Sequence, residues 1–219
     1  MRIIWRRKIM KRKKAATYFF VMCLSMAMTL SGLSMAAASE ITDGLKSVID
    51  RTIAIVVDPK YQKDKRLRRA AMRKIIEPKF NYAEMGRRSL AKNWNDRTEE
   101  ERKEFIRLFS KLLENSYASK IESYRDEKIV FTDEIIKGQF AMVKTRIERA
   151  HDKIDVDYKL KKTGNDWLVY DFIIEGVSMV RNYRSQFTKI IRRDSYKILL
   201  EKMTVKIAEL NLDPDDDNL

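Results

Sequence analysis

Residues 166–187 read DWLVYDFIIEGVSMVRNYRSQF, and this stretch decides the fold. Trp167–Ile174 is an apolar and aromatic run that Asp171 alone interrupts, which predicts a β-strand. Gly176 ends the strand, and apolar residues then recur at helical spacing at Val180, Tyr183 and Phe187. A strand that is apolar on both sides needs protein on both sides, or protein on one side and a non-polar ligand on the other.

Three segments before this stretch also have the periodicity of strands. Residues 128–132 and 139–149 lead to residues 154–160, where apolar side chains alternate with charged ones such as Asp155 and Asp157. Polar turns at residues 151–153 and 164–165 separate these segments. The pattern predicts an antiparallel meander in which Asp155 and Asp157 point to solvent.

Helical spacing precedes and follows the predicted sheet. Residues 41–56, 65–76 and 80–94 show it before a long helix that begins with a capping box at Thr98 and Glu101. Two more helices follow, at residues 178–192 and 195–210. Helices, an antiparallel sheet and further helices predict an α+β fold, with a helical part at about 39–125 and 178–210 and a sheet at about 128–176.

The N-terminal residues have the order of a secretory signal. Residues 1–14 carry eight basic side chains and no acidic one, residues 15–35 are apolar, and Ala-Ala-Ala-Ser follows. This order predicts a signal peptide, residues 1–38, that is cleaved after Ala38. A retained membrane anchor is the alternative, because the apolar stretch is long. The remaining chain is then one domain, residues 39–211, with a disordered acidic tail at residues 212–219.

Charge and cysteine content narrow the function classes. The net charge of +14 falls to +6 when the eight positive charges of the leader are removed. A moderately basic exported protein favours anionic membranes or acidic partners over nucleic acid. Cys23, the only cysteine, lies in the leader, so the remaining chain forms no disulfide and no cysteine zinc site.

Residues for enzyme chemistry are scarce. His151, the only histidine, lies in a polar turn, and no glycine-rich phosphate loop occurs. Without a second histidine or a cysteine there is no standard pair of nucleophile and base, so we predict no catalytic residue and no metal site.

The role of Asp171 remains open. We place it on one face of its strand together with Trp167, Val169 and Ile173. If that face is buried, the carboxylate needs a donor such as Arg146 or Arg184. A structural ion pair is favoured, with a catalytic acid in a cone-shaped pocket or a contact to a ligand headgroup as alternatives.

An apolar cavity between the sheet and the long helix is the alternative to catalysis. The side chains that could line it lie on the two predicted apolar faces: Phe105, Phe109, Leu112, Leu113, Val143, Ile147, Val156, Tyr158, Val169 and Ile173. Stripes of this kind also fill ordinary cores, so the pattern alone leaves both possibilities open.

The quoted stretch resembles the signature of the MlaC-like family, periplasmic phospholipid shuttles also called toluene-tolerance or ABC-transporter auxiliary proteins. The resemblance extends from about Ile41 to Met203. Among the matching residues we take the following as a structural signature: Trp167, Tyr170, Asp171, Gly176, Ser178, Tyr183 and Gln186.

The resemblance implies a curved sheet of nuclear-transport-factor-like type and a helical subdomain that enclose a lipid cavity. It implies a monomeric periplasmic shuttle with phospholipid as cargo and no cofactor, serving outer-membrane lipid asymmetry. Its partners would be an outer-membrane lipoprotein–porin complex and an inner-membrane ABC transporter with a lipid-binding partner domain. Arg146, Arg181 and Arg184 are the candidates for headgroup or partner contacts.

Three other functions stay open. The cargo could be a polycyclic lipid such as a hopanoid. The chain could be an enzyme on a cone-shaped sheet that uses Asp171, or a scaffold with a solid core.

Overall fold

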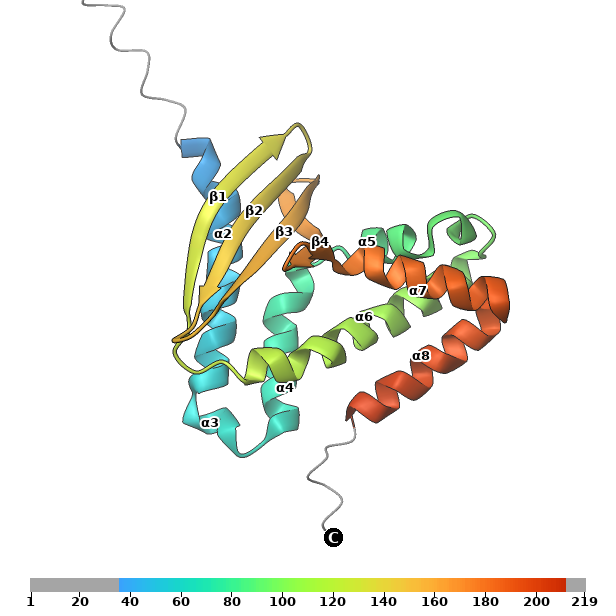
Figure 1. Ribbon diagram of the computed structural model, residues 1–219, viewed down its shortest axis with the longest axis horizontal. Helices are drawn as coiled ribbons and strands as arrows, with labels where there is room; N and C mark the ends of the chain where they lie inside the picture. Colours follow the sequence, from blue (N-terminus) through green and yellow to red (C-terminus); the bar gives the residue numbers. More distant parts are fainter. Residues whose placement is uncertain (1–35, 212–219) are drawn as a thin grey trace, which may run out of the picture. The chain divides into compact units, whose positions relative to one another are not determined.

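The computed structural model describes residues 36–211, with side chains from Glu40 onward (Figure 1). The chain divides into two compact units, Met1–Glu40 and Ile41–Leu219, and the fold below is that of the second. The cleavage of residues 1–38 and the tail at residues 212–219 stay predictions, because those segments lie almost entirely outside the described residues. Within residues 36–211, no helix is both long and apolar enough to cross a membrane.

The first helices end where the sequence supplies proline or a new cap. Asp58 accepts a hydrogen bond from the Lys60 backbone N–H at 2.9 Å and starts a short helix at Pro59. Asp64 caps the next helix through the Leu67 N–H at 2.8 Å. In order these elements are α2 (Ala36–Val57), α3 (Pro59–Gln62), α4 (Lys65–Ile76), η1 (Glu77–Lys79), α5 (Tyr82–Leu90) and η2 (Ala91–Trp94).

The predicted capping box opens the longest helix, α6 (Glu99–Glu122). The Thr98 hydroxyl accepts from the Glu101 N–H at 3.2 Å, and the Glu101 carboxylate accepts from the Thr98 N–H at 2.9 Å. Two otherwise unpaired donors of the first turn are thereby satisfied, and the predicted start of the helix is confirmed.

The sheet is an antiparallel meander in the order β1-β2-β3-β4-β5, which confirms the predicted α+β fold. Its strands are β1 (Lys128–Lys137), β2 (Phe140–Glu148), β3 (Lys153–Thr163), β4 (Asp166–Ile174) and β5 (Val177–Ser178). We call the face that carries Val143, Val156, Tyr158 and Val169 the inner face, and the opposite one the outer face.

Strand β1 is five residues longer than predicted. Its continuation contains Asp133 and Glu134, which interrupt the apolar pattern from which a strand is predicted. A bulge between Phe131 and Asp133 shifts the register, so that Glu134 pairs with Val143 of the inner face. There the Glu134 carboxylate accepts hydrogen bonds from the backbone N–H and the hydroxyl of Thr42 in α2. A charged residue thus continues the strand because a helix supplies its partner.

A second bulge, in β4, corrects a prediction about Asp171. Leu160 pairs with Val169 and Lys159 with Asp171, so Tyr170 is the extra residue. Beyond it the alternation is reversed: Trp167 and Val169 lie on the inner face, whereas Asp171 and Ile173 lie on the outer face. The prediction that these four residues share one face is therefore wrong.

The last two helices, α7 (Met179–Arg193) and α8 (Tyr196–Asn211), follow a tight turn. Glu175 and Gly176 both have positive φ, +48° and +75°, as a two-residue hairpin turn requires. Ser178 then caps α7 through the Arg181 N–H at 3.1 Å.

Two groups of buried apolar residues hold the fold together. The helical core joins α5, α6, α7 and α8, which gather beside the sheet in Figure 1. The sheet core joins α2 to the inner face through Ile41, Leu45, Ala141, Val143, Leu160 and Val169. The two cores differ in how completely they fill their surroundings.

Candidate functional site

The inner face of the sheet is covered by α2 along only part of its length. Ile41 and Leu45 of α2 pack in the sheet core. The same stripe continues with the buried Thr52 and Val56, which belong to neither core. The far ends of the strands carry inner-face residues that also belong to neither core: Ile129, Ile147, Ile154, Val156 and Ile174.

Tyr158 lies next to this part of the inner face. Its side chain is only partly covered by protein atoms, yet loss of solvent raises the pKa of its phenol to about 12. Within the described part of the chain, its hydroxyl has no hydrogen-bond partner. Tyr158 also packs against the sheet core, so it lies between that core and the strand ends that belong to neither core.

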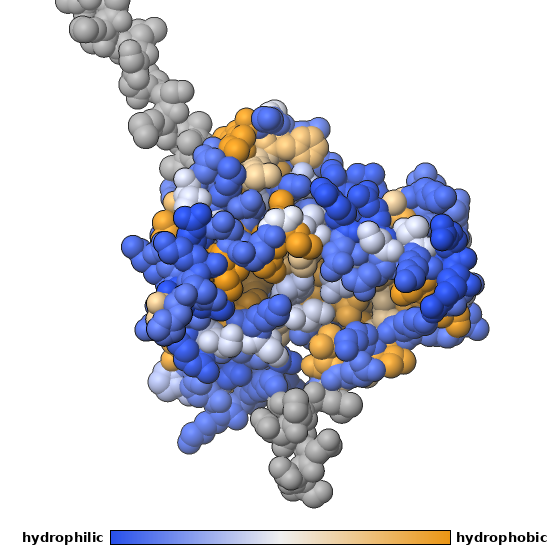
Figure 2. Space-filling model, viewed as in Figure 1, coloured by the Kyte–Doolittle hydropathy of each residue, from blue (hydrophilic) through white to orange (hydrophobic). Residues whose placement is uncertain are grey.

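A hollow is visible in the space-filling view (Figure 2). In Figure 2 apolar side chains form its floor, beside the strands, and hydrophilic side chains surround it. Val56 also belongs to the wall of a pocket of about 570 Å³, which lies where α2, α3, α4 and the end of α6 meet. Its lining residues are Val56, Val57, Gln62, Arg68, Glu122, Tyr124 and Arg125. We call this pocket the mouth.

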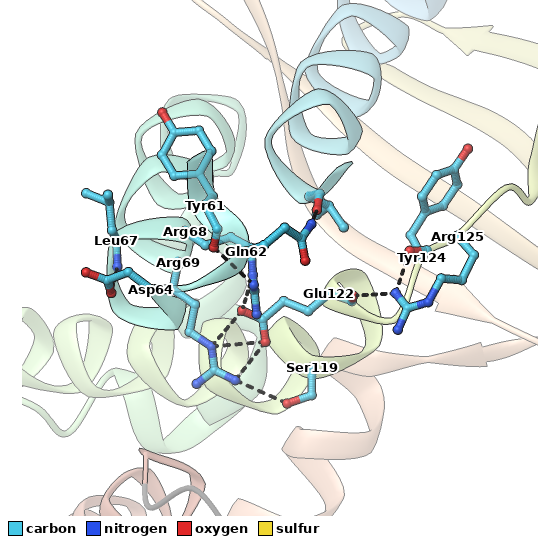
Figure 3. A network of polar contacts seen from close by, with 11 residues as sticks. Tyr61, Gln62, Asp64, Leu67, Arg68, Arg69, Ser119, Glu122, Tyr124 and Arg125 are labelled. Atoms are coloured by element: carbon cyan, nitrogen blue, oxygen red, sulfur yellow. Dashed lines mark hydrogen bonds and ion pairs between the residues drawn. The ribbon is translucent and has the colours of Figure 1, made fainter. Parts of the chain in front are cut away.

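Arginine side chains dominate the polar part of the mouth (Figure 3). Arg68 Nε lies 3.1 Å from Glu122 Oε1, and Arg69 Nη2 lies 3.0 Å from Glu122 Oε2. Arg125 donates to the backbone carbonyls of Glu122 and Tyr124 at 3.3 and 2.9 Å. The Glu122 side chain is only 7% exposed, so its carboxylate is held by two guanidinium groups away from most of the solvent.

This arrangement leaves the mouth positively charged. Arg68 and Arg69 share one carboxylate, Arg125 donates only to backbone carbonyls, and Val57 beside them is half exposed. A cationic rim next to an apolar floor suits an amphipathic ligand with an anionic group and non-polar chains.

The structure separates the predicted lining residues into three groups. Ile147, Val156 and Tyr158 lie on the inner face, so their place in a lining stays a prediction. Val143 and Val169 are fully buried in the sheet core beneath α2, so they are core residues rather than lining residues. Ile173 lies on the outer face as a result of the bulge at Tyr170, so its place in the predicted lining is wrong.

The four lining residues predicted on α6 are also misplaced. The Phe105 and Phe109 rings lie 5.7 and 5.5 Å from the Phe187 ring of α7 and are fully buried. Leu112 and Leu113 belong to the same helical core. They are buried there together with residues of α5, α7 and α8, so they form part of a filled core.

Sequence reasoning missed the residues of the mouth. Val56 was part of a predicted apolar stripe, but Arg68 and Glu122 are 54 positions apart and belong to no motif. Only the meeting of α4 with the end of α6 brings them together.

The outer face carries a second, smaller pocket of about 150 Å³. Its lining residues are Arg88, Lys159, Tyr170, Asp171, Ser178, Val180, Arg181 and Arg184. Two of the three predicted contact residues, Arg181 and Arg184, therefore meet here. The third, Arg146, lies elsewhere on the outer face and pairs with the exposed Asp155 at 2.8 Å.

Asp171 has a structural role in this second pocket. Its carboxylate accepts from Ser178 Oγ at 2.7 Å and from the Val180 N–H at 3.1 Å, and Lys159 Nζ lies 3.9 Å away. The predicted donors Arg146 and Arg184 are not its hydrogen-bond partners among residues 36–211. Asp171 thus joins β4 to the first turn of α7.

The other signature residues also serve the fold. Trp167 packs on the sheet core, Gly176 adopts the positive φ of the turn, and Ser178 caps α7. Tyr170 lies 4.3 Å beneath the Arg88 guanidinium and 5.9 Å from the Phe140 ring. Tyr183 contacts Phe109 at 5.3 Å, and Gln186 donates to Asn182 at 3.3 Å.

The remaining polar candidates form no catalytic or metal centre. His151 is exposed between β2 and β3, and Asp155 is exposed on the outer face, as predicted. In the part of the chain that the structure describes, no group of three His, Cys, Asp or Glu side chains could hold a metal ion.

A curved sheet whose inner face is only partly covered, beside an arginine-rich pocket, suits a protein that binds a ligand rather than one that catalyses a reaction. The model of the family described as MlaC protein matches residues 46–205, and the chain belongs to this family. The family is one of phospholipid-binding transport proteins and not of enzymes, which confirms the prediction that the chain has no enzymatic function.

Known proteins that are similar to the chain include the following two. The intermembrane phospholipid transport system binding protein MlaC of Haemophilus influenzae is 26% identical over 150 residues, which cover 66% of this chain and 70% of that protein. The phospholipid-binding protein from Ralstonia solanacearum, solved in complex with a phospholipid, shares the fold with a TM-score of 0.72 at 20% identity. That alignment covers 78% of this chain and 99% of the Ralstonia chain.

Proposed function

We propose that residues 39–211 form a lipid-binding domain that holds the acyl chains of a phospholipid in the inner-face hollow. The observation that carries this proposal is the row of apolar side chains at the ends of the strands that packs into neither core. Family membership and the names of the two similar proteins support phospholipid as the cargo.

The free energy of hydration explains why a carrier needs such a hollow. Each acyl CH₂ group exposed to water costs about 0.8 kcal/mol, so a two-chain lipid with roughly thirty of them costs on the order of 20 kcal/mol. An apolar hollow removes most of that cost without any catalytic group. The work of the protein is to replace the membrane interior during transfer.

The headgroup of the cargo lies at the mouth. Arg68, Arg69 and Arg125 provide more positive charge there than Glu122 neutralises. A phosphodiester would compete with the carboxylate for the two guanidinium groups, and the acyl chains would extend past Val56 toward Ile147 and Val156. Charge-assisted hydrogen bonds of this kind are the strongest that arginine makes.

The transport route belongs to the same proposal. A leader at residues 1–38 directs the chain to the periplasm, where it moves phospholipid as a monomer between the outer and inner membranes. Its partners are an inner-membrane ABC transporter with a lipid-binding partner domain and an outer-membrane lipoprotein–porin complex. The family and the name of the Haemophilus relative support this route.

Transfer of lipid between vesicles tests the proposal. Donor vesicles contain a self-quenching fluorescent phospholipid and acceptor vesicles contain none. We expect the initial transfer rate to rise in proportion to the concentration of the protein. Ile147→Trp fills the hollow and should abolish most of this rate, whereas Met142→Trp, on the outer face of the same strand, should leave it unchanged.

Equal transfer by both variants would show that the lipid does not occupy the hollow. No transfer by the wild-type protein would contradict the carrier function itself.

A further inference from the structure

The outer-face pocket is built from five elements, and Ser178 of β5 lies at its floor. Lys159 comes from β3, Tyr170 and Asp171 from β4, Arg88 from α5, and Arg181 and Arg184 from α7. Because Lys159 and Asp171 pair across the outer face while Tyr158 and Phe172 pair across the inner face, the pocket and the hollow lie on opposite sides of the sheet. A ligand in one leaves the other open.

The polar groups at the floor of the pocket already have hydrogen-bond partners within the protein. Ser178 Oγ and the Val180 N–H both donate to Asp171, so the first turn of α7 is capped from within the protein. Arg88 is fixed in place by the Tyr170 ring at 4.3 Å and by Glu84, whose carboxylate it contacts at 2.8 Å. The floor is therefore rigid and needs no ligand to complete it.

The rim, in contrast, has unbalanced charge. Arg181 and Arg184 lie three positions apart on α7, both are exposed, and neither has an ion pair within residues 36–211. Arg88 and Lys159 also line the pocket, but each has a carboxylate partner, Glu84 and Asp171 respectively, so the charges of Arg181 and Arg184 are the unbalanced ones. Two free guanidinium groups beside a rigid concave floor can each bind a carboxylate in a bidentate manner.

We propose that this pocket is a docking site for an acidic segment of a partner protein, with side-chain carboxylates bound by Arg181 and Arg184. The proposal rests on the proposed function, because a carrier must dock on other proteins while its lipid site stays open. A flat membrane surface fits the pocket less well, since the free cations surround a concave floor rather than a protruding one. Charge complementarity of this kind steers association and fixes orientation.

Binding of two labelled peptides tests the docking site. One peptide alternates Glu and Ser, and the matched peptide has Gln in place of each Glu. Fluorescence anisotropy should show that the protein without residues 1–38 binds the Glu peptide and not the Gln peptide. Arg181→Glu with Arg184→Glu should weaken binding by about tenfold or more.

The control changes the same charge with the same spacing on the same helix. Lys189→Glu with Arg192→Glu alters two exposed residues of α7 that lie outside the pocket, and it should change the affinity by less than about twofold. Equal losses from both double variants would overturn the proposal, because they would show a general effect of net charge. Binding of wild-type protein to phosphatidylglycerol vesicles but not to the Glu peptide would overturn it in favour of a membrane contact.

The lipid content of the same samples separates this proposal from the proposed function. The Arg181→Glu, Arg184→Glu variant should keep the lipid load of the wild-type protein in organic extracts, since the hollow lies on the other side of the sheet. Absence of lipid from the wild-type protein would contradict the proposed function and leave the peptide result to be judged by itself.

Discussion

The helical core and the inner-face hollow use the same kinds of side chain but fill space differently. In the helical core, Phe105 and Phe109 have rings 5.7 Å apart and both contact Phe187. Around the hollow, Ile147, Ile154 and Ile174 stay partly exposed, although they line the covered face of a sheet. The difference shows that an apolar stripe becomes a core or a cavity depending on whether a second apolar surface reaches it.

The geometry of the elements decides which outcome occurs. Three helices converge on α6 and mesh their side chains, whereas α2 contacts the sheet mainly through Ile41 and Leu45. Stacked layers that diverge leave a space that aliphatic side chains cannot fill. Packing therefore stabilises the helical part of the molecule more than the ends of the strands.

A cavity made in the helical core should have the largest effect on stability. We expect Phe109→Ala to lower the free energy of unfolding by about 3–5 kcal/mol, because the ring is fully buried among aromatic neighbours. Chemical denaturation followed by circular dichroism measures the change. A loss below about 1 kcal/mol would show that the core is not tightly packed.

The contact of Asp171 with the first turn of α7, which joins the sheet to the helical core, should have the second largest effect on stability. Asp171→Asn keeps the shape of the side chain but weakens the hydrogen bonds from Ser178 and Val180, and should cost about 2–3 kcal/mol. Asp155→Asn is the control, since Asp155 is exposed on the same face of the sheet and should leave the unfolding curve unchanged. Equal stability of both variants would contradict the role of Asp171 as a joint.

Low pH should destabilise the helical part of the molecule through protonation of Glu84. Hydrogen bonds from Arg87 and Arg88 outweigh the effect of burial and lower the pKa of this carboxyl from 4.5 to about 2. The stabilisation is present above pH 4.5 and is lost as the pH falls toward 2, by about 1–2 kcal/mol once solvent screening is allowed for. Denaturation curves measured across this range give the free energy of unfolding at each pH. This free energy should fall less steeply with decreasing pH for Glu84→Gln than for the wild-type protein, and equal slopes would contradict the assignment.

Enlarging a side chain should have the smallest effect where space exists. Ile147→Trp, beside the hollow, should change the free energy of unfolding by less than about 1 kcal/mol, whereas Leu112→Trp in the helical core should cost about 1–3 kcal/mol. Thermal unfolding of the lipid-free proteins compares the two. A larger cost at Ile147 than at Leu112 would show that the hollow is filled and would remove the distinction between the two regions.

The sequence predicts the elements of the fold well but the positions of the site poorly. Strand alternation and the Thr98–Glu101 box depend on near neighbours in the chain, so they can be read from local patterns. The bulge at Tyr170 cannot, since it appears only in the pairing of β4 with β3, and it moved Ile173 to the outer face.

The mouth was beyond sequence reasoning for the same reason. Arg68 and Glu122 come from helices that meet only in the folded chain. The apolar stripe of α6 was recognised, but no local signal tells whether helices or a sheet will cover it. Tertiary packing, rather than the residue pattern, separated core from cavity.

Native mass spectrometry of the protein purified from the periplasm of cells that produce it tests the central claim most directly. We expect a complex whose mass exceeds that of the polypeptide by one phospholipid, with the lipid lost on collisional activation and absent from the Ile147→Trp variant. A single species at the mass of the bare polypeptide, with no lipid in an organic extract, would contradict a hydrocarbon-filled interior.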